Sequence, residues 1–385
     1  MTEATGAPVD IAIVGGGPVG LSLALALRDS GRGVTVLEAR PKGPVTDARA
    51  IVLSHGSRLI LERLGVWSLL VTRTTPITTI HVSQRGHLGR TVLNAADLDV
   101  PAMGYTAAYE DLHAALVEQA IAAGVEVRYA ASVTAAEPGR VTYQQGHATA
   151  DLAADLVVLA EGGRGLPLPA VAEKDYQQSA VVCWVESTRP HAGRAYERFT
   201  PEGPIALLPM GSRYAVVWTT PVDQVEDRLA LSDADFLVAL YAAFGERQGR
   251  FKAAGARSAF PLRMALRGPG DTAGLIRIGN AAQLLHPVAG QGFNLGLRDA
   301  WQLAECVLDS PPTSLDGADL LLRYIRARGA DVSAGARMTD FLVDVFAHDP
   351  PVIAGLRGAA LTALDLLPAL KNGFARKMMH GVRTW

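Results

Sequence analysis

The sequence contains little cysteine, with only Cys183 and Cys306 among its 385 residues. Two cysteines cannot form a disulfide framework or a metal cluster by themselves, so we expect a reducing, cytoplasmic setting and no bound metal. Positive charge is not in excess either, because 36 Lys and Arg stand against 38 Asp and Glu. That balance excludes the strongly basic surface typical of nucleic-acid-binding proteins.

Long uninterrupted hydrophobic segments are also lacking. The longest run free of charged residues and histidine, residues 11–27, contains the sequence GGGP, which would break a membrane-spanning helix in its middle. Residues 1–10 carry no basic region ahead of an apolar stretch, so we expect neither a secretory signal nor a transmembrane segment. The length and the 49% of hydrophobic residues suffice for two domains that share a large core.

Residues 9–38 predict a dinucleotide-binding unit made of a strand, a tight turn, a helix and a second strand. The first strand would span Val9–Val14, the helix would end near Ser30, and Glu38 would close the second strand. Three glycines fit the pattern G-x-G-x-x-G: Gly15, Gly17 and Gly20. They permit the turn, the approach of a pyrophosphate and close helix packing, while Glu38 can accept a hydrogen bond from a ribose. A turn needed only for packing would not account for Glu38.

A second glycine-rich segment, residues 277–299, reads RIGNAAQLLHPVAGQGFNLGLRD. It follows a predicted strand, and Asn280 stands at the carboxyl edge, where open α/β sheets place their ligands. Gly290 and Gly292 precede a helical pattern whose first backbone N–H groups can stabilise negative charge on a reduced flavin. A ligand held near both ends of the chain should be long, which favours FAD over NAD. An ordinary capped helix after a loop is the alternative.

Several segments together resemble the ubiquinone-biosynthesis hydroxylases, which are flavoprotein aromatic monooxygenases. The segments include DARAIVLSHGS, RAYERFTPEGPIALLPM and GNAAQLLHPVAGQGFNLGLRD, and the similarity extends from about residue 9 to 345. The likeness is strongest to the branch that hydroxylates 2-octaprenyl-6-methoxyphenol. Asn280 with Gln283 replaces the Asp and His usual in the wider superfamily, and that replacement is typical of the ubiquinone branch.

The resemblance implies FAD, a transiently bound NAD(P)H donor and O2. In that family hydride reduces the flavin, O2 forms a C4a-hydroperoxide, and its distal oxygen passes to an electron-rich phenol, so the cofactor carries the chemistry. The expected function is hydroxylation of a polyprenylated phenol in ubiquinone biosynthesis. Two alternatives stay open: a flavin monooxygenase acting on another small aromatic or secondary metabolite, and a non-catalytic FAD-binding subunit of a quinone-synthesis complex.

The resemblance also implies site residues. Those expected to bind the cofactor are Gly15, Gly17, Pro18, Gly20, Glu38, Arg49, Val133, Gly279, Asn280, Pro287, Gly290, Gly292, Phe293 and Asn294. His286 and Pro287 are candidates beside the flavin, although for His286 a structural hydrogen bond to the backbone is the commoner role. The chain departs from the family at Glu161, where an Asp is usual, and at Tyr109, where many members have Arg. Because Glu161 is longer than the usual Asp, binding of the NAD(P)H donor is in question.

The expected fold class is α/β: a Rossmann-like FAD-binding domain with an inserted mixed β-sheet substrate domain and C-terminal helices. The FAD-binding domain would comprise residues 1–75, 100–175 and 262–310, the substrate-binding sheet residues 76–99 and 176–261, and the helical region residues 311–385. Alternation predicts that one face of the sheet covers the substrate. Its candidates are Tyr196, Phe199, Leu207, Pro209 and Trp218, with plain core packing as the alternative for each.

The C-terminal tail joins apolar residues to Lys371, Arg376, Lys377 and Arg383. Such a segment can lie on the inner face of a membrane and help to extract a lipid-soluble substrate, or it can be a helix packed on the core with a basic end. The sequence leaves the ring position, the prenyl length, NADH against NADPH and the oligomeric state undecided.

Overall fold

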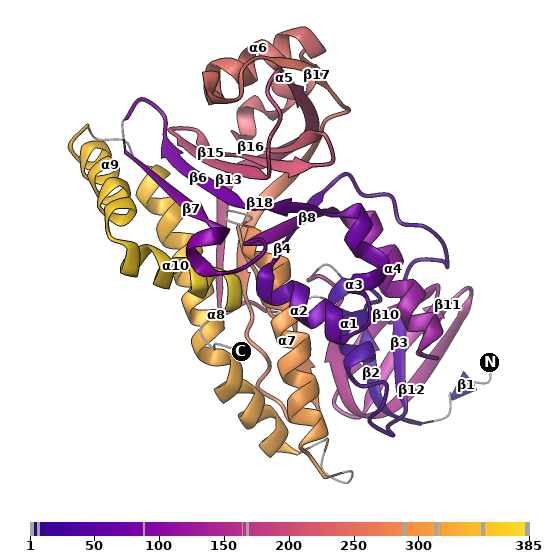
Figure 1. The fold of residues 1–385 in the computed structure, drawn as a ribbon. Coiled ribbons are helices and arrows are strands. Elements are labelled where there is room, and N and C mark those ends of the chain that lie inside the picture. Colours follow the sequence, from indigo (N-terminus) through magenta and orange to yellow (C-terminus); the bar gives the residue numbers. More distant parts are fainter. Residues whose placement is uncertain are drawn as a thin grey trace.

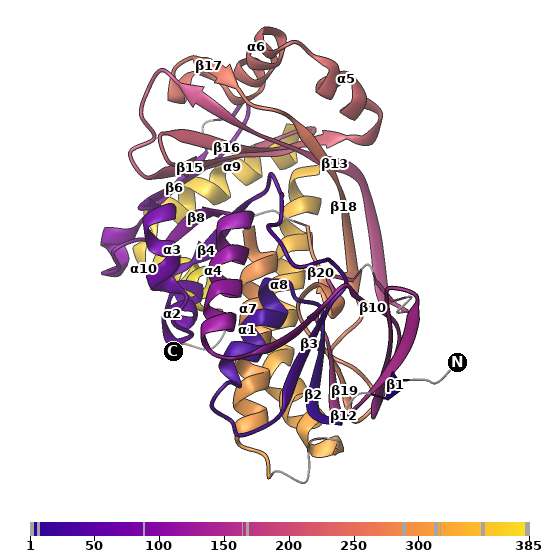
Figure 2. The ribbon, with the colours of Figure 1, turned by 90° about the vertical axis from the view of Figure 1, so that its right-hand side faces the viewer.

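The computed structural model describes residues 4–5, 8–87, 89–163, 165–166, 169–286, 290–311, 315, 317–347 and 351–381. Two lobes lie one above the other in Figure 1, and helices from the C-terminal part of the chain run along one side of both. Two very long strands, at residues 172–187 and 258–266, reach from the upper lobe towards the lower one (Figure 2). The lobes are therefore joined by regular structure.

The lower lobe is built on a mixed sheet with parallel strands at its centre. In spatial order its strands are β10 (Ala131–Glu137), β11 (Arg140–Gln145), β12 (Ala148–Leu159), β2 (Val9–Val14), β3 (Val34–Glu38) and β9 (Glu126–Tyr129), with β1 (Ala4–Thr5) and β19 (Leu275–Arg277) also paired to β12. The first half of β12 pairs with antiparallel β11, and its second half lies between parallel β2 and β19. The ends of β2, β12 and β19 therefore meet at one edge.

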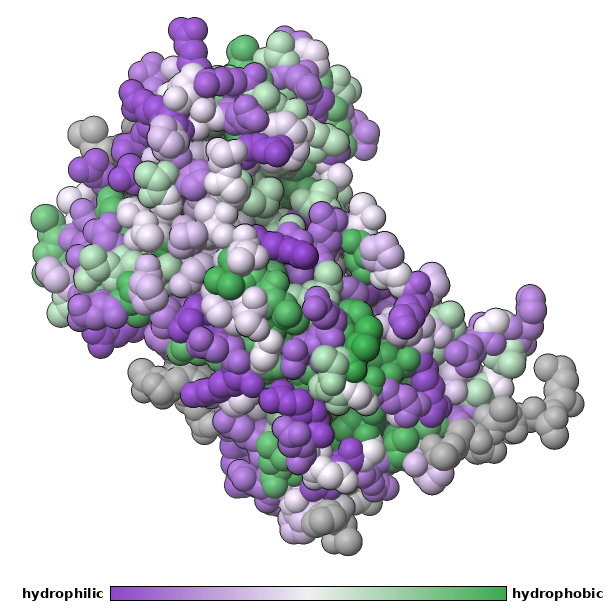
Figure 3. All heavy atoms as spheres, turned by 45° about the vertical axis from the view of Figure 1, so that its right-hand side comes forward, coloured by the Kyte–Doolittle hydropathy of each residue, from purple (hydrophilic) through white to green (hydrophobic). Residues whose placement is uncertain are grey.

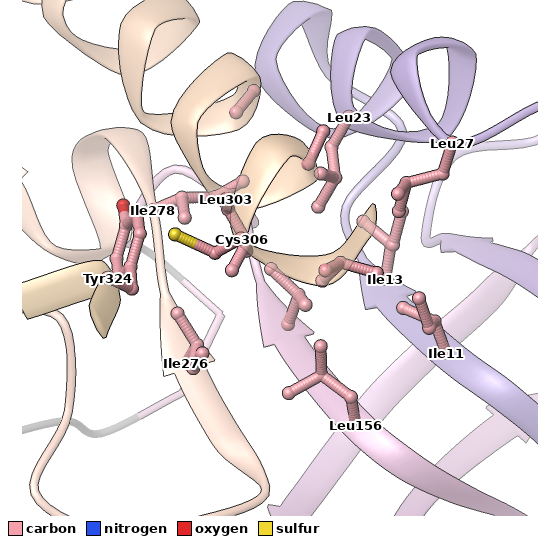
Figure 4. Packing of buried hydrophobic residues seen from close by; sticks show 14 of the residues in the cluster. Ile11, Ile13, Leu23, Leu27, Leu156, Ile276, Ile278, Leu303, Cys306 and Tyr324 are labelled. Carbon is pink, nitrogen blue, oxygen red and sulfur yellow. The ribbon is translucent and has the colours of Figure 1, made fainter. Parts of the chain in front are cut away.

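Both faces of this sheet are covered, which explains why residues 11–14 of β2 and 156–159 of β12 are continuously apolar. Ile11 and Ile13 face the helices α1 (Pro18–Ala26), α7 (Gln291–Leu308) and α8 (Ala318–Ala347), where they meet side chains such as Leu23 and Leu303 (Figure 4). Ala12 and Val14 of the same strand point the other way, into a cluster with residues of β10, β11 and the first half of β12.

Three backbone segments meet so closely beside β2 that only glycine fits. A Cβ on Gly296 of α7 would lie 2.9 Å from Cγ2 of Val19 and 3.1 Å from Cα of Gly279. The contact brings α1, α7 and the short 3-10 helix η5 (Gly279–Ala281) together. Gly296 thus serves helix packing.

A small three-stranded sheet connects the lobes. It consists of β4 (Ala50–Ser54), β8 (Gly104–Ala108) and β5 (Thr75–Ile77), all antiparallel. Beside it lie α2 (His55–Arg63), α3 (Trp67–Leu70), α4 (Tyr109–Ala122) and the 3-10 helix η1 (Val71–Arg73). Leucines of these helices, together with Leu21 and Leu25 of α1, form a second buried cluster.

The upper lobe is a large mixed sheet. In order its strands are β20 (Gln283–Leu284), β18 (Ser258–Leu266), β13 (Ala172–Ser187), β16 (Arg213–Pro221), β15 (Gly203–Met210), β14 (Arg194–Thr200), β6 (Thr79–Gln84) and β7 (Arg90–Asn94), and β17 (Phe251–Ala254) pairs with β13. The connections after β7 and β16 include η2 (Ala95–Leu98), η3 (Val222–Gln224), α5 (Val225–Ala230), α6 (Asp233–Phe244) and η4 (Glu246–Gln248). We call the face that carries α5 and α6 the outer face and the opposite one, towards the lower lobe, the inner face (Figure 1).

The C-terminal helices α8, α9 (Pro351–Leu366) and α10 (Pro368–His380) lie against the side of both lobes (Figure 1). Ala375 and Met379 of α10 pack into a cluster with Leu93, Leu98 and Met103. Among the described residues, none of the helices is both long and apolar enough to span a bilayer.

The predicted fold class is confirmed: a Rossmann-like unit, an inserted sheet and C-terminal helices are all present. A hairpin turns at Gly146, between β11 and β12. The boundaries predicted for the sheet domain differ from the strands, because β13 already begins at Ala172 and β18 continues to Leu266. The helix after the first glycines ends at Ala26, four residues before Ser30.

Replacing Gly296 by Ala should lower the free energy of unfolding by about 1–3 kcal/mol, since the added methyl group forces Val19 or the Gly279 backbone to move. The matched control is Gly329→Ala in α8, where nothing lies within 4 Å of the new methyl group. It should raise stability by about 0.5–1 kcal/mol. Denaturant unfolding measures both values, and equal effects would contradict the packing role of Gly296.

Candidate active site

The N-terminus of α1 forms one half of the candidate site. Gly15, at φ +109°, sits so tightly beneath β12 that a Cβ would lie 2.7 Å from the carbonyl oxygen of Ala160. Gly17 is the N-cap, no side chain caps the helix, and nothing lies within 4 Å of where its Cβ would be. Pro18 occupies the first helical turn. The open space and the uncapped N–H groups fit the pyrophosphate of a dinucleotide.

Glu38 already has protein partners at the end of β3. One carboxylate oxygen accepts from the N–H of Gly16 at 2.8 Å, and the other accepts from the Arg40 backbone and from Nε at 2.8 Å each. Burial raises the pKa of Glu38, but the hydrogen bonds and charge of Arg40 and the Gly16 N–H outweigh it, and the net pKa is lowered. An ionised carboxylate has further lone pairs. A hydrogen bond from a ribose hydroxyl to the Glu38 carboxylate therefore stays a prediction, and the geometry permits it.

A group of cationic and aromatic side chains lies between Glu38 and the upper lobe. Arg49 is held by Asp47, with Nη2 at 2.6 Å from the carboxylate, which together with the negative charge raises the Arg49 pKa despite burial. Its guanidinium lies 4.9 Å from the ring centre of Tyr109 and 5.5 Å from that of Phe260. Arg49 thus spans from the lower lobe to the inner face of the upper sheet.

Sequence reasoning missed two members of this group. Nη2 of Arg40 is 3.4 Å from Nε2 of His113, and the same Nε2 is 3.1 Å from the carbonyl oxygen of Gly16. The ring of His113 also stacks on Tyr109. Tyr109, the position where many family members have Arg, is therefore flanked by two arginines from other segments, Arg40 and Arg49. The available signal was the placement of Arg40 two residues after Glu38.

The second glycine-rich segment begins at the end of β19. Gly279 adopts φ +59° and donates its N–H to Asp299 at 3.0 Å, and the Gln283 amide donates to the same carboxylate oxygen. Asn280 follows half-buried, and its side chain makes no hydrogen bond to a described residue. Glu161, at the end of neighbouring β12, accepts from the N–H of Gly165 at 3.0 Å. Asn280 is placed at the strand edge as predicted.

The N-terminus of α7 forms the other half of the site. Gly290 is its N-cap at φ +61°, no side chain caps the helix, and a Cβ on Gly292 would meet nothing within 4 Å. Phe293 packs half-buried against the cluster around α2 and α4. Val133 lies half-buried on β10. Pro287 lies outside the described residues.

Asn294 is among the residues expected to bind the cofactor, and its side chain is engaged within the protein. The side chain is fully buried and makes four hydrogen bonds within the protein. Its oxygen accepts from Ser54 N–H at 2.8 Å and Ser57 Oγ at 2.7 Å, and its amide donates to the carbonyl oxygens of Val52 and Gly290 at 2.9 and 2.8 Å. Every site on the amide is used, so it fixes the helix N-terminus to β4.

His286 is also buried, at 1% exposure, with its ring edge-to-face on Tyr176 at 4.9 Å. Burial lowers its pKa to about 4, so the imidazole is neutral at physiological pH. Sequence reasoning left open a proton relay or a structural role. The packing on Tyr176 shows a ring held by the protein interior.

Four of the five substrate candidates lie on the outer face, so their prediction as inner-face residues is wrong. Tyr196, Leu207 and Trp218 pack with Phe236, Leu240 and Phe244 of α6 in one cluster. Pro209 is directly opposite Tyr214 of that cluster and shares its face. Phe199 has the opposite parity to Tyr196 on β14 and lies on the inner face. The prediction assumed that large apolar side chains line the substrate cavity. In the structure these side chains pack against α6.

Comparison with known proteins first identifies the class. The sequence family described as FAD binding domain matches residues 8–334. The chain therefore belongs to this family of FAD-binding proteins. The two uncapped, glycine-containing helix N-termini are compatible with that cofactor, with one at each end of an elongated ligand.

The relatives then narrow the class. The chain is 34% identical to ubiquinone hydroxylase UbiL of Rhodospirillum rubrum, over 96% of this chain and 89% of the relative. It is 28% identical to 3-demethoxyubiquinol 3-hydroxylase of Escherichia coli, over 96% and 97%. The structure of p-nitrophenol 4-monooxygenase PnpA from Pseudomonas putida shares the fold, with a TM-score of 0.76 at 18% identity over all of both chains. The resemblance to the ubiquinone-biosynthesis hydroxylases is confirmed, and the chain is an FAD-dependent hydroxylase.

The burial of His286 predicts acid sensitivity. The unfolded chain takes up a proton on this histidine near pH 6.5 and the folded chain only near pH 4, so stability is lost as the pH falls between these values. His286 contributes at most roughly 3 kcal/mol to that loss. Urea unfolding between pH 7 and pH 4 should show a shallower decline for His286→Leu than for the wild type. The control, His147→Leu at the exposed β11–β12 turn, should follow the wild type.

Proposed function

We propose that this chain hydroxylates the aromatic ring of a polyprenylated phenol in ubiquinone biosynthesis, using NAD(P)H and O2. The observation that carries the proposal is the full-length similarity to ubiquinone hydroxylases at up to 34% identity. It is supported by a site made of backbone amides, cations and an apolar sheet face. The described residues contain no cluster of His, Cys, Asp or Glu arranged to hold a metal ion.

In this proposal the two helix N-termini hold the two ends of FAD. Gly15, Gly17, Pro18 and Gly20 face the pyrophosphate, Glu38 and Val133 the adenosine, and Arg49, Gly279 and Asn280 the middle of the molecule. Gly290, Gly292 and Phe293 present backbone N–H groups to the flavin ring, beside His286 and Pro287. The flavin, when bound, supplies electron transfer and oxygen activation. The protein orients the ring and excludes water from it.

The inner face of the upper sheet is the proposed substrate wall. Ala180, Val182, Val217, Phe260 and Leu262 form an apolar cluster there, separate from the α6 cluster on the outer face. The Arg49 guanidinium over Phe260 places this cluster next to the proposed flavin position. Figure 3 shows hydrophobic residues gathered from the middle of the molecule down over the lower lobe. Such a wall suits a prenylated phenol.

The corner between α9 and α10 is the proposed membrane contact. Leu366, Leu367 and Leu370 are exposed by 73%, 53% and 59%, and the exposed cations Arg376 and Lys377 follow on α10. Lys371 is bound to Asp365 instead. Exposed leucines beside unpaired cations match an anionic lipid surface, from which a prenylated substrate would be taken.

The catalytic proposal is tested with purified protein, FAD and short-chain prenylphenols. The expected result is substrate-dependent oxidation of NADH or NADPH with ¹⁸O from labelled O2 in the phenol product, measured by mass spectrometry. NAD(P)H oxidation without a hydroxylated product would favour another substrate, and failure to bind the substrate would favour a non-catalytic subunit. Unchanged quinone intermediates in a deletion strain would exclude the ubiquinone pathway.

The membrane proposal predicts that the triple variant Leu366→Ser, Leu367→Ser, Leu370→Ser loses about tenfold or more of its binding to anionic vesicles, because three apolar side chains no longer enter the interface. Vesicle sedimentation measures the change, and added salt should weaken binding of the wild type. Val238→Ser on α6, 69% exposed, is the control. Binding that the triple variant retains, or that only a protein partner supports, would contradict a lipid contact at this corner.

A further inference from the structure

Register across the sheet places the side chain of Glu197, on β14, on the inner face of the upper sheet. Phe260 pairs with Ala180 on β13, and Val182 of the same strand pairs with Val217 on β16. Val217 pairs with Ala206 on β15, and Ala206 pairs with Glu197 on β14. Paired residues in a sheet point to the same face, so Glu197 shares the face of Phe260 and the apolar wall.

Most immediate neighbours of Glu197 on this face are short and apolar. Val82 and Ala206 are directly beside it on β6 and β15, and Ala195 precedes it by two residues on β14, whereas Phe199 follows it by two. The outer face of the same strands carries Tyr196 and Leu207. None of these neighbours on the inner face can pair with a carboxylate.

Glu197 makes no hydrogen bond or ion pair with any described residue, although it is half-buried. Water-sized molecules can reach it, yet the surrounding protein raises the pKa of Glu197 to about 7 by burial alone. No charged side chain contributes to that shift. A carboxylate that is partly accessible yet strongly desolvated would be explained by a substrate cavity in front of it.

A second polar group on the same face also lacks a partner. Gln84 of β6 is directly opposite Phe199, two residues from the Glu197 pair, and its Oε1 is buried without a hydrogen bond. Diagonal neighbours on adjacent strands are about 7–8 Å apart, so two long side chains can converge on one group between them. Buried polar atoms are normally satisfied. Two unsatisfied acceptors side by side in an apolar wall indicate a ligand that brings hydrogen-bond donors.

We propose that Glu197, with Gln84 beside it, binds the ring hydroxyl of a phenolic substrate and takes its proton during hydroxylation. The inference rests on the proposed function, because it assumes a phenol in this cavity. The phenolic O–H bond breaks, the proton goes to a Glu197 carboxylate oxygen, and the electron pair stays on the phenolic oxygen, where it activates the ring towards an electrophilic oxygen. When the ring carbon releases its own proton to solvent, Glu197 returns the first one to the phenolic oxygen.

The chemistry suits the environment of this residue. A general base works best when its pKa lies near the working pH, and an ordinary exposed glutamate is too weak a base for that. Burial gives Glu197 such a pKa without a neighbouring charge. The same cavity rejects a ligand with no donor, because the carboxylate would then be left desolvated and unpaired.

The test uses the FAD-loaded protein and two probes, a 2-methoxyphenol with a dimethylallyl chain and its O-methyl ether. Binding is followed by the flavin absorbance, without turnover. The wild type should bind the phenol at least about tenfold more tightly than the ether, the value of one hydrogen bond to a charged group. Glu197→Gln should reduce that preference to about threefold or less and lower the product formed per NAD(P)H by about 100-fold, with hydrogen peroxide formed instead.

Glu197→Asp, which keeps the base on a shorter side chain, should restore part of the coupling. Glu186→Gln, at an exposed position on β13, is the control and should match the wild type. Glu197→Gln removes a desolvated charge, so its melting temperature should not fall, which separates the proposal from a structural role. A Gln variant with unchanged preference and coupling would overturn the inference. A wild type that shows the binding preference but hydroxylates no prenylphenol would overturn the proposed function only.

Discussion

The carboxylate of Asp299 is the interaction on which the second half of the candidate site depends. It is 1% exposed and binds the Gly279 N–H, the Gln283 amide and Nε of Arg328, the last at 2.7 Å. One side chain of α7 therefore fixes the turn after β19 and the helix α8 at once. Arg328 and the buried Arg298 both bind Asp331, so two cations balance the two carboxylates in this interior. Removing one member of such a buried set would leave an uncompensated charge, at a cost of about 3–5 kcal/mol.

Asn294 complements Asp299 one turn earlier on the same helix. Its amide ties Gly290 to Val52 and Ser54 of β4, so the N-terminus of α7 is positioned before any cofactor binds. The two residues explain why the GLRD end of the segment and its Asn are polar in an otherwise apolar helix face. They form the support behind the backbone N–H groups, which are then free to point at a ligand without reorganising.

The local features of the fold could be predicted from the sequence because they follow from short-range chemistry. Strand, glycine turn and helix at residues 9–38, and the placement of Asn280 after β19, need only periodicity and backbone sterics. The direction of side chains in the upper sheet could not be predicted in the same way. Alternation shows that a strand has two faces, but the identity of the inner face depends on where α6 packs, 40 residues further along the chain. His113 and Asp299 were missed because their partners are distant in sequence.

The distribution of side chains in the upper sheet follows from what covers each face. The outer face meets a helix of this chain, so large rings such as Trp218 and Tyr196 can be buried there permanently. On the inner face the residues beside Glu197 on the neighbouring strands are short, and Phe199 follows it on β14. A carboxylate that is desolvated without a protein partner is costly, so a ligand that donates a hydrogen bond would stabilise this face. Unsatisfied polar residues are consequently more informative about a binding wall than aromatic residues, which this sheet carries on both faces.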